Sequence, residues 1–323
     1  MKFSALELEQ ACALVYGQMS ATAQYVWPLL SEIVGCETWV KHENHTPTGA
    51  FKVRGGITFV DWVQRTRPDV TGLVTATRGN HGQAQSRAAS RAGLSVNIFV
   101  PKGNSEEKNL AMKAFGANLV EFGEDFDEAR LEAARQAKIN DWLIVPAFHT
   151  ELVRGVATYA FELLSGAPHL DTIYIPIGCG SGICGAILAR DALGVNTKIV
   201  GVVSEHAMTA KLSVDQGELV ETNSAKTFAD GMAVRVPVQA AFDIYRQGAD
   251  RIICVSEHEI AEAMRIYFRS IHQVSEGAGA AALAGLMQER EKMAGKAVAV
   301  ILSGGNIDTK DFNCVLGGSF PKV

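Results

Sequence analysis

Nine short apolar runs, separated by segments with helical spacing, recur between about residue 37 and residue 302 of this chain. Each run is continuously apolar instead of alternating with polar residues, which is typical of a strand covered by helices on both faces. Regular alternation of strands with helices implies right-handed crossovers within an open, mostly parallel sheet. The sequence therefore predicts an α/β fold. The predicted strands are TWVKH, GLVTAT, SVNIFV, ANLVEF, WLIVP, TIYIPI, KIVGVV, RIICV and AVAVIL.

Composition and charge argue against several classes of partner. The 323 residues are 47% hydrophobic and 20% charged, with a formal net charge of -5, as in ordinary globular proteins. No basic run of the kind that tracks a phosphate backbone occurs, so we expect no nucleic-acid partner. The N-terminal segment has the pattern of an amphipathic helix and not of a signal peptide, and no apolar stretch reaches membrane-spanning length. We therefore expect a cytoplasmic protein without a membrane partner.

The cysteines form no C-x-x-C pair and no cysteine–histidine cluster with the spacing of a zinc site. The sequence thus predicts neither a disulfide framework nor a structural metal. We interpret the six cysteines as small buried residues. They are Cys12, Cys36, Cys179, Cys184, Cys254 and Cys314.

Unusual residues follow the first predicted strand, in the segment from His45 to Gly55. Pro47 and Gly49 shape a turn, and the apolar run behind them is predicted to be helical, which places Lys52 near a helix N-terminus. The helix dipole and partial burial both lower the pKa of a lysine there, which favours the neutral amine that forms a Schiff base. The alternative is a lysine that is merely exposed on a first helical turn.

A second segment, Thr75 to Gln83, follows the strand GLVTAT. Gly79 lets the backbone turn tightly, and the amides at the start of the next helix can hold a carboxylate. Asn80 is either the N-cap of that helix or a functional residue. His81 is either a general base or a structural histidine beside the cap.

A third segment, Gly178 to Gly185, joins the strand TIYIPI to a helix, and its glycines expose backbone N–H groups that suit a phosphate. The alternative is that the glycines form a turn by chance and bind nothing. The loop also contains G-x-G-x-x-G from Gly180 to Gly185, with Glu205 about 20 residues further on, which is the dinucleotide-binding pattern. The pattern would indicate a nicotinamide-dependent oxidoreductase. The position of the loop argues against this interpretation, because the loop lies deep in the chain, whereas the dinucleotide-binding pattern normally occurs at the start of its domain.

The last predicted strand ends at Ser303, in the sequence L-S-G-G-N. A small hydroxyl at this position can hydrogen-bond a ring nitrogen without carrying a charge. The alternative is a simple turn in which the hydroxyl ends the strand.

In this order, the segments A-F-K-V-R-G, R-G-N-H-G-Q, G-C-G-S-G, S-E-G-A-G-A and L-S-G-G-N resemble the serine/threonine dehydratase and serine racemase group of enzymes, which use pyridoxal 5′-phosphate (PLP). The resemblance extends from about Gln18 to Asp308. It implies the tryptophan-synthase-like fold type II, with two open, mostly parallel sheets flanked by helices in two interleaved domains. The large domain would comprise residues 1–71 and 150–323, and the small, substrate-closing domain residues 72–149. Such relatives also lead us to expect a homodimer or homotetramer.

The resemblance assigns a role to each matching residue. Lys52 would hold PLP as a Schiff base and then act as the acid–base group at the substrate Cα. Phe51 would flank the ring, and Asn80 would hydrogen-bond its 3′-oxygen. Ser303 would face the pyridine nitrogen, where a neutral hydroxyl suits β-elimination. The residues that would wrap the phosphate are Gly178, Cys179, Gly180, Ser181 and Gly182, and those that would help hold the substrate carboxylate are Thr77, Gly79 and His81.

These roles imply an ammonia-lyase that converts a 3-hydroxy-L-amino acid of the threonine/serine type to a 2-oxo acid and ammonia. Arg78, however, stands where the group commonly carries a second serine, which is the acid–base group of racemases. Arginine is a poor base, so we expect little racemisation. Arg78 either binds substrate, favouring a bulkier or acidic substrate such as 3-phenylserine or 3-hydroxyaspartate, or points to solvent.

Two further departures concern the metal and the regulatory domain. The positions that match the group's divalent-cation ligands are Val203 and Thr209, neither of which is a carboxylate, so we expect no metal there. The chain ends soon after Asn306, so we expect no C-terminal regulatory domain.

Overall fold

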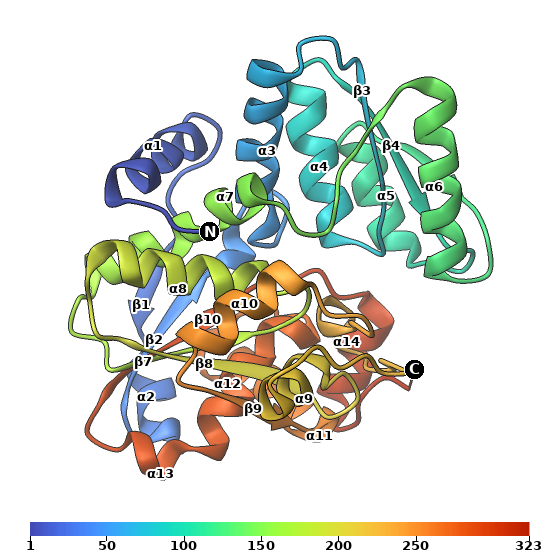
Figure 1. The fold of residues 1–323 in the computed structure, drawn as a ribbon. Helices are drawn as coiled ribbons and strands as arrows, with labels where there is room; N and C mark the ends of the chain where they lie inside the picture. Colours follow the sequence, from blue (N-terminus) through green and yellow to red (C-terminus); the bar gives the residue numbers. More distant parts are fainter. Residues whose placement is uncertain (323) are drawn as a thin grey trace.

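The apolar runs form two separate sheets in the computed structural model, which describes residues 1–322 (Figure 1). All nine predicted strands are present, and the α/β prediction is confirmed. The larger sheet has the order β1 (Gln24–Val26), β2 (Glu37–His42), β10 (Ala297–Leu302), β7 (Thr172–Pro176), β8 (Lys198–Ser204) and β9 (Arg251–Val255). The smaller sheet has the order β5 (Asn118–Glu121), β4 (Ser95–Val100), β3 (Gly72–Ala76) and β6 (Leu143–Ile144).

Strand pairing is parallel throughout both sheets except at one edge, where β1 pairs antiparallel with β2. The register of β10 against β2 runs from Ala297 opposite Glu37 to Leu302 opposite His42. The carboxyl ends of these two strands therefore lie side by side, although their residues are far apart in the sequence. The segments that follow them must meet at this edge of the sheet.

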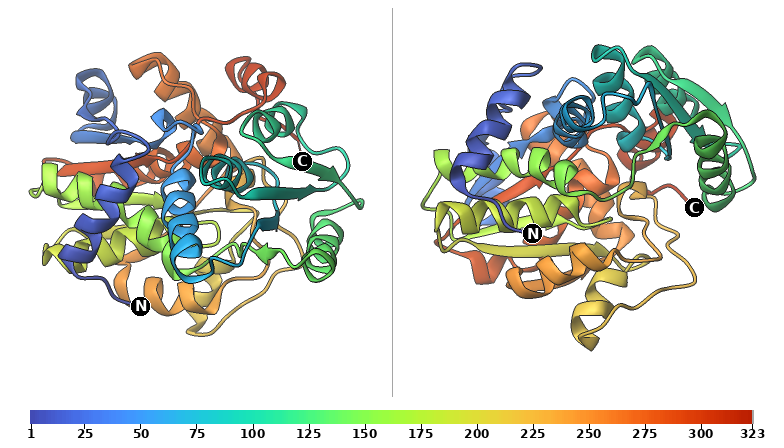
Figure 2. Two further views of the ribbon diagram at one scale, coloured as in Figure 1. Left: turned by 90° about the horizontal axis from the view of Figure 1, so that it is seen from above. Right: turned by 45° about the horizontal axis from the view of Figure 1, so that its top comes forward.

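Alternate residues of the central strands enter two different cores, which explains why the runs are continuously apolar. On β10, Val298 and Val300 pack into one core, and Ala299 and Ile301 pack into the other. Helices cover both faces of the larger sheet (Figure 2). One face carries α2 (Pro28–Val34), α11 (Glu257–Ile271), α12 (Gly277–Gln288), α13 (Arg290–Met293) and α14 (Thr309–Leu316). The other carries α1 (Ala5–Tyr16), α7 (Thr150–Gly166), α8 (Ser181–Leu193), α9 (Thr209–Gln216) and α10 (Gln239–Gly248).

The smaller sheet has its own apolar cores, to which five helices contribute. These are α3 (Lys52–Thr66), α4 (Asn80–Arg91), α5 (Glu106–Ala114), α6 (Phe126–Asn140) and, through Leu152, α7. Two short 3-10 helices, η1 (Glu43–His45) and η2 (Asp230–Met232), lie in loops. None of the helices formed by residues 1–322 is both long and apolar enough to cross a membrane.

Helix α3 packs tightly between α4 and α7, beside the smaller sheet in the upper part of Figure 1. A Cβ atom on Gly55 would lie 2.7 Å from the backbone oxygen of Leu152, and one on Gly155 would lie 2.2 Å from the backbone oxygen of Arg54. Because backbone atoms cannot move aside, only glycine allows α3 and α7 to approach this closely. This contact fixes the position of the first turn of α3, which begins at Lys52.

Candidate active site

The segments that follow β2 and β10 are joined by backbone hydrogen bonds. The N–H of Phe51 donates to the carbonyl oxygen of Ser303 over 3.0 Å, and the N–H of Gly305 donates to that of Gly49 over 2.9 Å. An isolated antiparallel bridge links Ala50 with Gly304 between them. The structure thus brings Lys52 and Ser303, two residues predicted from separate motifs, to the same edge of the sheet.

Lys52 is the first residue of α3, as predicted, and is half-buried. Burial lowers the pKa of its amine, an effect that the nearby Cys179 and Glu276 only partly offset. Its Nζ atom lies 5.0 Å from the centroid of the Phe51 ring. The interpretation of Lys52 as a merely exposed surface lysine is therefore wrong, and its surroundings favour the neutral, nucleophilic amine.

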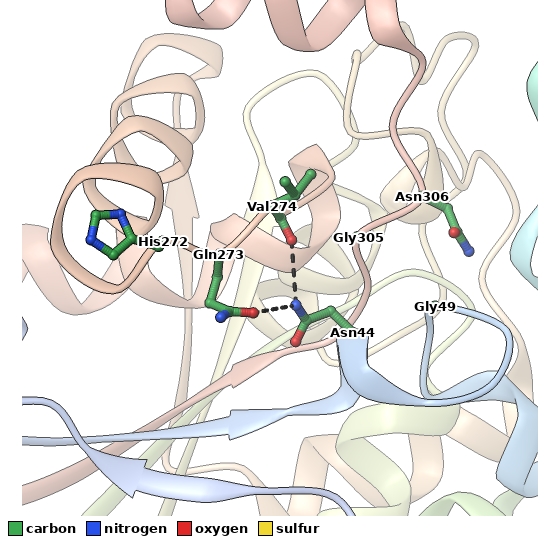
Figure 3. Close-up of a pocket in the computed structure, with 7 residues that line it drawn as sticks. All are labelled: Asn44, Gly49, His272, Gln273, Val274, Gly305 and Asn306. Carbon is green, nitrogen blue, oxygen red and sulfur yellow. Dashed lines mark hydrogen bonds between the residues drawn. The ribbon is translucent and has the colours of Figure 1, made fainter.

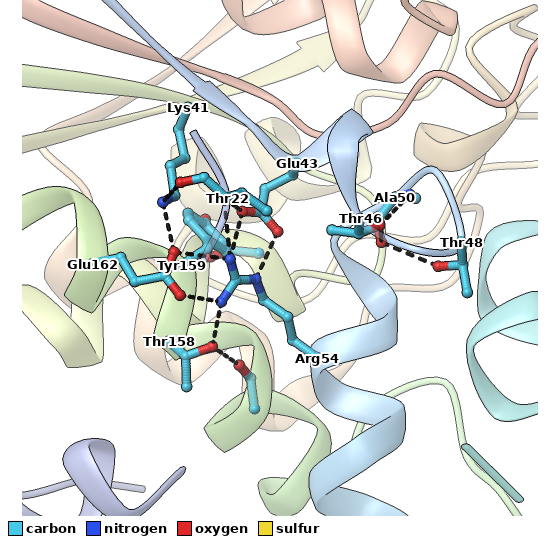
Figure 4. A network of polar contacts seen from close by, with 12 residues as sticks. Thr22, Lys41, Glu43, Thr46, Thr48, Ala50, Arg54, Thr158, Tyr159 and Glu162 are labelled. Atoms are coloured by element: carbon cyan, nitrogen blue, oxygen red, sulfur yellow. Dashed lines mark hydrogen bonds and ion pairs between the residues drawn. The ribbon is translucent and has the colours of Figure 1, made fainter. Parts of the chain in front are cut away.

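A buried ionic network holds the start of α3 in place (Figure 4). The Arg54 guanidinium donates from Nε to Glu43 Oε2 over 2.8 Å and from Nη1 to Glu162 Oε1 over 2.6 Å. Glu162 also accepts from Lys41 Nζ over 2.6 Å. The side chains of Arg54 and Glu43 are fully buried, so the network ties α3 to β2 and α7 inside the protein.

The glycine loop after β7 leads directly into α8, whose N-cap is Gly180 with a φ of 94°. A Cβ atom on Gly178 would lie 2.3 Å from the backbone oxygen of Gly231, so no side chain fits there. A Cβ on Gly182 would meet the Phe51 ring only at 3.7 Å, which places this glycine directly beside that ring. The unpaired amides of a helix N-terminus therefore lie next to Phe51 and Lys52.

Helix α4 begins at Asn80, with Gly79 as its N-cap. The interpretation of Asn80 as the cap is wrong, because the extended backbone of Gly79 makes Asn80 the first helical residue. Its side chain points to other elements instead: Nδ2 donates to Glu276 Oε1 over 2.7 Å, and Oδ1 accepts from Asn306 Nδ2 over 2.8 Å. Thr77 Oγ1 accepts from the N–H of Gly79 over 3.1 Å, which shapes the turn before the helix.

His81 lies near Lys52 with one ring nitrogen unsatisfied. Burial lowers the pKa of His81 to about 3, helped by the charge of Lys52 and opposed by the Val145 backbone. Its Nε2 atom is buried and has no hydrogen-bond partner among residues 1–322. A neutral histidine with a free buried nitrogen is suited to a hydrogen bond with a ligand.

An open cleft with a volume of about 350 Å³ lies between the smaller sheet and the loops of the larger one. Lys108 of α5 forms an ion pair with Asp230 of η2 across it, and Ser105 donates to Asp308 over 2.5 Å. Arg78 is exposed and lines the cleft, so it faces both the site and the solvent. The other polar side chains lining it include Lys102, Asn104, Glu124, Thr227, Glu276, Asn306, Lys310 and Asp311.

Asn306 also borders a second hollow of about 350 Å³ (Figure 3). The residues that line this hollow are Asn44, Gly49, His272, Gln273, Val274, Gly305 and Asn306. Asn44 Nδ2 donates to Gln273 Oε1 over 3.1 Å and to the carbonyl oxygen of Val274 over 3.4 Å. These bonds fasten the loop before α12 to the segment after β2.

Glu276 lies among the site residues although the sequence predicts no role for it. It is the glutamate of the motif S-E-G-A-G-A, and that motif alone does not indicate what the carboxyl group does. By contrast, Glu205 accepts from the N–H of Glu257 over 3.1 Å and so supports the start of α11. Val203 and Thr209, which the resemblance predicted to stand in place of metal ligands, are both buried.

The site fits PLP on three structural observations. Lys52 has an amine whose pKa is lowered by burial, Gly178 lies where no side chain can enter, and His81 carries an unsatisfied buried nitrogen. An amine, a glycine loop at a helix N-terminus and free polar atoms are what such a cofactor and its substrate require.

Comparison with known proteins leads to the same group of enzymes. The chain is 35% identical to an L-threonine ammonia-lyase of Geobacter sulfurreducens over 88% of this chain and 71% of that protein. It is 30% identical to an L-threo-3-hydroxyaspartate ammonia-lyase of Saccharomyces cerevisiae over 90% of this chain and 89% of that protein. Among solved structures, a processed threonine deaminase isoform 2 of Solanum lycopersicum superposes with a TM-score of 0.90 at 26% identity, covering 98% of this chain and 94% of that one.

A family model described as pyridoxal-phosphate dependent enzyme matches residues 21–304. That match includes Lys52, Asn80, the glycine loop and Ser303, and it leaves the dinucleotide interpretation without support. The chain belongs to the family of pyridoxal-phosphate dependent enzymes.

Proposed function

We propose that this enzyme is a dehydratase that converts a 3-hydroxy-L-amino acid of the threonine/serine type to a 2-oxo acid and ammonia. The observation that carries the proposal is the placement of Lys52, with its lowered pKa, between the glycine loop, Asn80 and Ser303. The names of the Geobacter sulfurreducens and Solanum lycopersicum relatives support the reaction class.

The cofactor would be held by the residues already grouped around Lys52. Phe51 would flank its ring, Asn80 would hydrogen-bond its 3′-oxygen, and Ser303 would face its pyridine nitrogen. Its phosphate would take the backbone amides and the hydroxyl of the glycine loop, formed by Gly178, Cys179, Gly180, Ser181 and Gly182. Bound PLP withdraws electrons from the substrate Cα and so makes its proton acidic.

The protein's own groups then carry the elimination. Thr77, Gly79 and the neutral His81 hold the substrate carboxylate, and the amine of Lys52 takes the proton from Cα. The ammonium formed on Lys52 returns that proton to the hydroxide that leaves Cβ, so water departs, and the released enamine is hydrolysed by water to the 2-oxo acid and ammonia. Arg78 stands where racemases carry their second acid–base group, and its guanidinium is both a poor base and a very weak acid, so we expect racemisation to be slow.

A second candidate substrate class keeps the reaction and changes the side chain. The exposed guanidinium of Arg78 at the rim of the cleft can pair with an acidic group or stack on an aromatic one. The L-threo-3-hydroxyaspartate ammonia-lyase of yeast supports the acidic class. 3-Hydroxyaspartate and 3-phenylserine are therefore tested beside threonine and serine.

The remaining proposals concern the whole protein. By chain segment, residues 72–149 would form a small domain that closes on substrate, and residues 1–71 and 150–323 would form the large domain, with α3 at the boundary because it packs on the smaller sheet. The enzyme acts in the cytoplasm as a homodimer or homotetramer on a small amino-acid substrate, and without a metal at Val203 and Thr209. Structures with and without substrate that kept the same relative domain position would contradict the closure.

The first experiment is an absorption spectrum of the purified enzyme reconstituted with PLP. We expect a visible band that is lost in Lys52→Ala and kept in Lys211→Ala, a variant of a surface lysine paired with Asp215. L-threonine, L-serine, L-threo-3-hydroxyaspartate and L-threo-3-phenylserine are then added separately while 2-oxo acid release is followed. Release from none of them would contradict the proposed reaction, whereas a protein that never binds PLP would contradict the placement of the cofactor.

A further inference from the structure

Glu276 is a buried carboxyl group whose position is not explained by the helix that it precedes. It is the N-cap residue of α12 and is only 3% exposed, yet its side chain makes no capping hydrogen bond to that helix. Its Oε1 atom accepts from Asn80 Nδ2, and its Oε2 atom has no hydrogen-bond partner in the part of the chain that the structure describes. Burying a carboxyl group with one unsatisfied oxygen costs folding free energy, so its presence here points to a functional role.

The residues around Glu276 leave space for its carboxyl group. A Cβ atom on Gly304 would lie 2.6 Å from Glu276 Oε1, so a side chain at that position would displace the carboxyl group. The N–H of Glu276 donates to the carbonyl oxygen of Gly304 over 3.1 Å. The L-S-G-G-N segment therefore fixes both the backbone and the carboxyl group of Glu276 beside Lys52 and Asn80.

The hydrogen bonds of Asn306 determine the orientation of the Asn80 side-chain amide, that is, which of its terminal atoms is the oxygen and which is the nitrogen. Asn306 Nδ2 donates to the carbonyl oxygen of Thr48 over 2.8 Å, which identifies it as the amide nitrogen. The same nitrogen donates to Asn80 Oδ1, so the other terminal atom of Asn80 is Nδ2, and this atom donates to Glu276. One hydrogen of Asn80 Nδ2 is thereby used, and the second is left for a ligand.

We propose that Glu276 is a positioning residue, which with Asn306 holds the Asn80 amide so that its second N–H hydrogen faces the 3′-oxygen of the cofactor. This inference rests on the proposed placement of PLP at Lys52. It does not depend on which amino acid is the substrate. A freely rotating Asn80 would present its oxygen to the electron-rich 3′-oxygen for part of the time, and this would weaken binding.

The charges around Glu276 give the proposal a spectroscopic consequence. Burial raises the pKa of Glu276 to about 7, and the carboxylate of Asp230 in η2 adds to this. Lys108 of α5, the Asn80 amide and Lys52 of α3 act in the opposite direction. Glu276 is therefore protonated below about pH 7 and ionised above it, while its Oε1 atom accepts from Asn80 in both forms. Ionisation changes the field at the bound cofactor, so the visible band should show a step near neutral pH.

Two substitutions separate the hydrogen bond of Glu276 from its charge. Glu276→Gln keeps an acceptor oxygen but cannot ionise, so PLP affinity should stay within about threefold of the wild type and the step near pH 7 should disappear. Glu276→Leu removes the acceptor, and PLP affinity should fall about tenfold or more. Glu289→Gln, a buried glutamate at the other end of α12, is the control and should leave both the affinity and the step unchanged.

A double-mutant cycle distinguishes positioning through Asn80 from a general packing defect. If Glu276 acts through Asn80, Glu276→Leu should change PLP affinity by less than about threefold once Asn80→Ala is present. The melting temperature of each apo variant is measured in parallel to show that it is folded. An equal loss in both backgrounds would overturn the proposal, as would a step near pH 7 that persists in Glu276→Gln. A protein in which Lys52→Ala keeps the visible band would instead refute the underlying placement of PLP.

Discussion

At the scale of single residues, Gly178 offers a direct test of the phosphate cradle. Gly178→Ala would place a Cβ atom 2.3 Å from the backbone oxygen of Gly231, so the loop must shift away from its place beside Lys52. We expect the dissociation constant for PLP, followed by absorption titration of the apoenzyme, to rise about tenfold or more. Gly17→Ala at the end of α1 is the control, because its Cβ would meet backbone oxygens only at 3.4 Å and beyond. Unchanged PLP binding by Gly178→Ala would contradict the cradle.

The residues of the site that follow strand ends were predictable from the sequence, because special residues after a buried parallel strand collect at one edge of a sheet. Lys52, the glycine loop and Ser303 belong to this class. Glu276 was not predictable, because its hydrogen-bond partner Asn80 is 196 residues away and begins α4, a helix that packs on the other sheet. Nor could the sequence distinguish Asn80 as a cap from Asn80 as a functional residue, because the choice depended on the backbone of Gly79.

At the scale of secondary-structure elements, the first turn of α3 depends on the buried guanidinium of Arg54. Arg54→Met would leave Glu43 and Glu162 buried without their main cation. We expect the free energy of unfolding of the apoenzyme, measured by chemical denaturation, to fall by about 3–5 kcal/mol. Arg65→Met removes an exposed ion pair with Asp61 on the same helix and should cost no more than about 1 kcal/mol. Equal costs for the two variants would show that the network contributes no special stability.

The elements themselves were largely predictable, because burial on both faces makes each central strand a continuous apolar run. The exception is β1, which has only three residues, Gln24–Val26, with two of them exposed. Such a short edge strand is defined by its antiparallel pairing with β2 and not by an apolar pattern of its own. The Arg54 network was not predictable either, because its partner Glu162 lies 108 residues away and only the packing of α3 on α7 brings it to Arg54.

At the scale of the whole molecule, the candidate site is formed where two sheets with separate cores meet. Lys52 and Asn80 are the first residues of α3 and α4, which pack on the smaller sheet, whereas the glycine loop, Glu276 and Ser303 belong to the larger one. Any relative movement of the two sheets therefore changes the distance between Lys52 and Asn80 on one side and the glycine loop and Ser303 on the other. The ion pair between Lys108 and Asp230 lies across this junction, and it is the contact whose loss should loosen it.

Lys108→Met tests that idea, because methionine keeps an apolar stem but removes the charge. Burial lowers the pKa of Lys108, yet Asp230 and Glu276 outweigh this and raise it, so the ammonium is a stable partner at neutral pH. We expect amide hydrogen exchange in α5 and η2 of the substrate-free enzyme to become about tenfold faster, since opening of the junction then requires less free energy. Lys113→Met, an exposed lysine on the same helix, should leave the exchange unchanged. If Lys108→Met also exchanges at the wild-type rate, the ion pair does not hold the two sheets together, and the junction must depend on other contacts such as the hydrogen bond from Ser105 to Asp308.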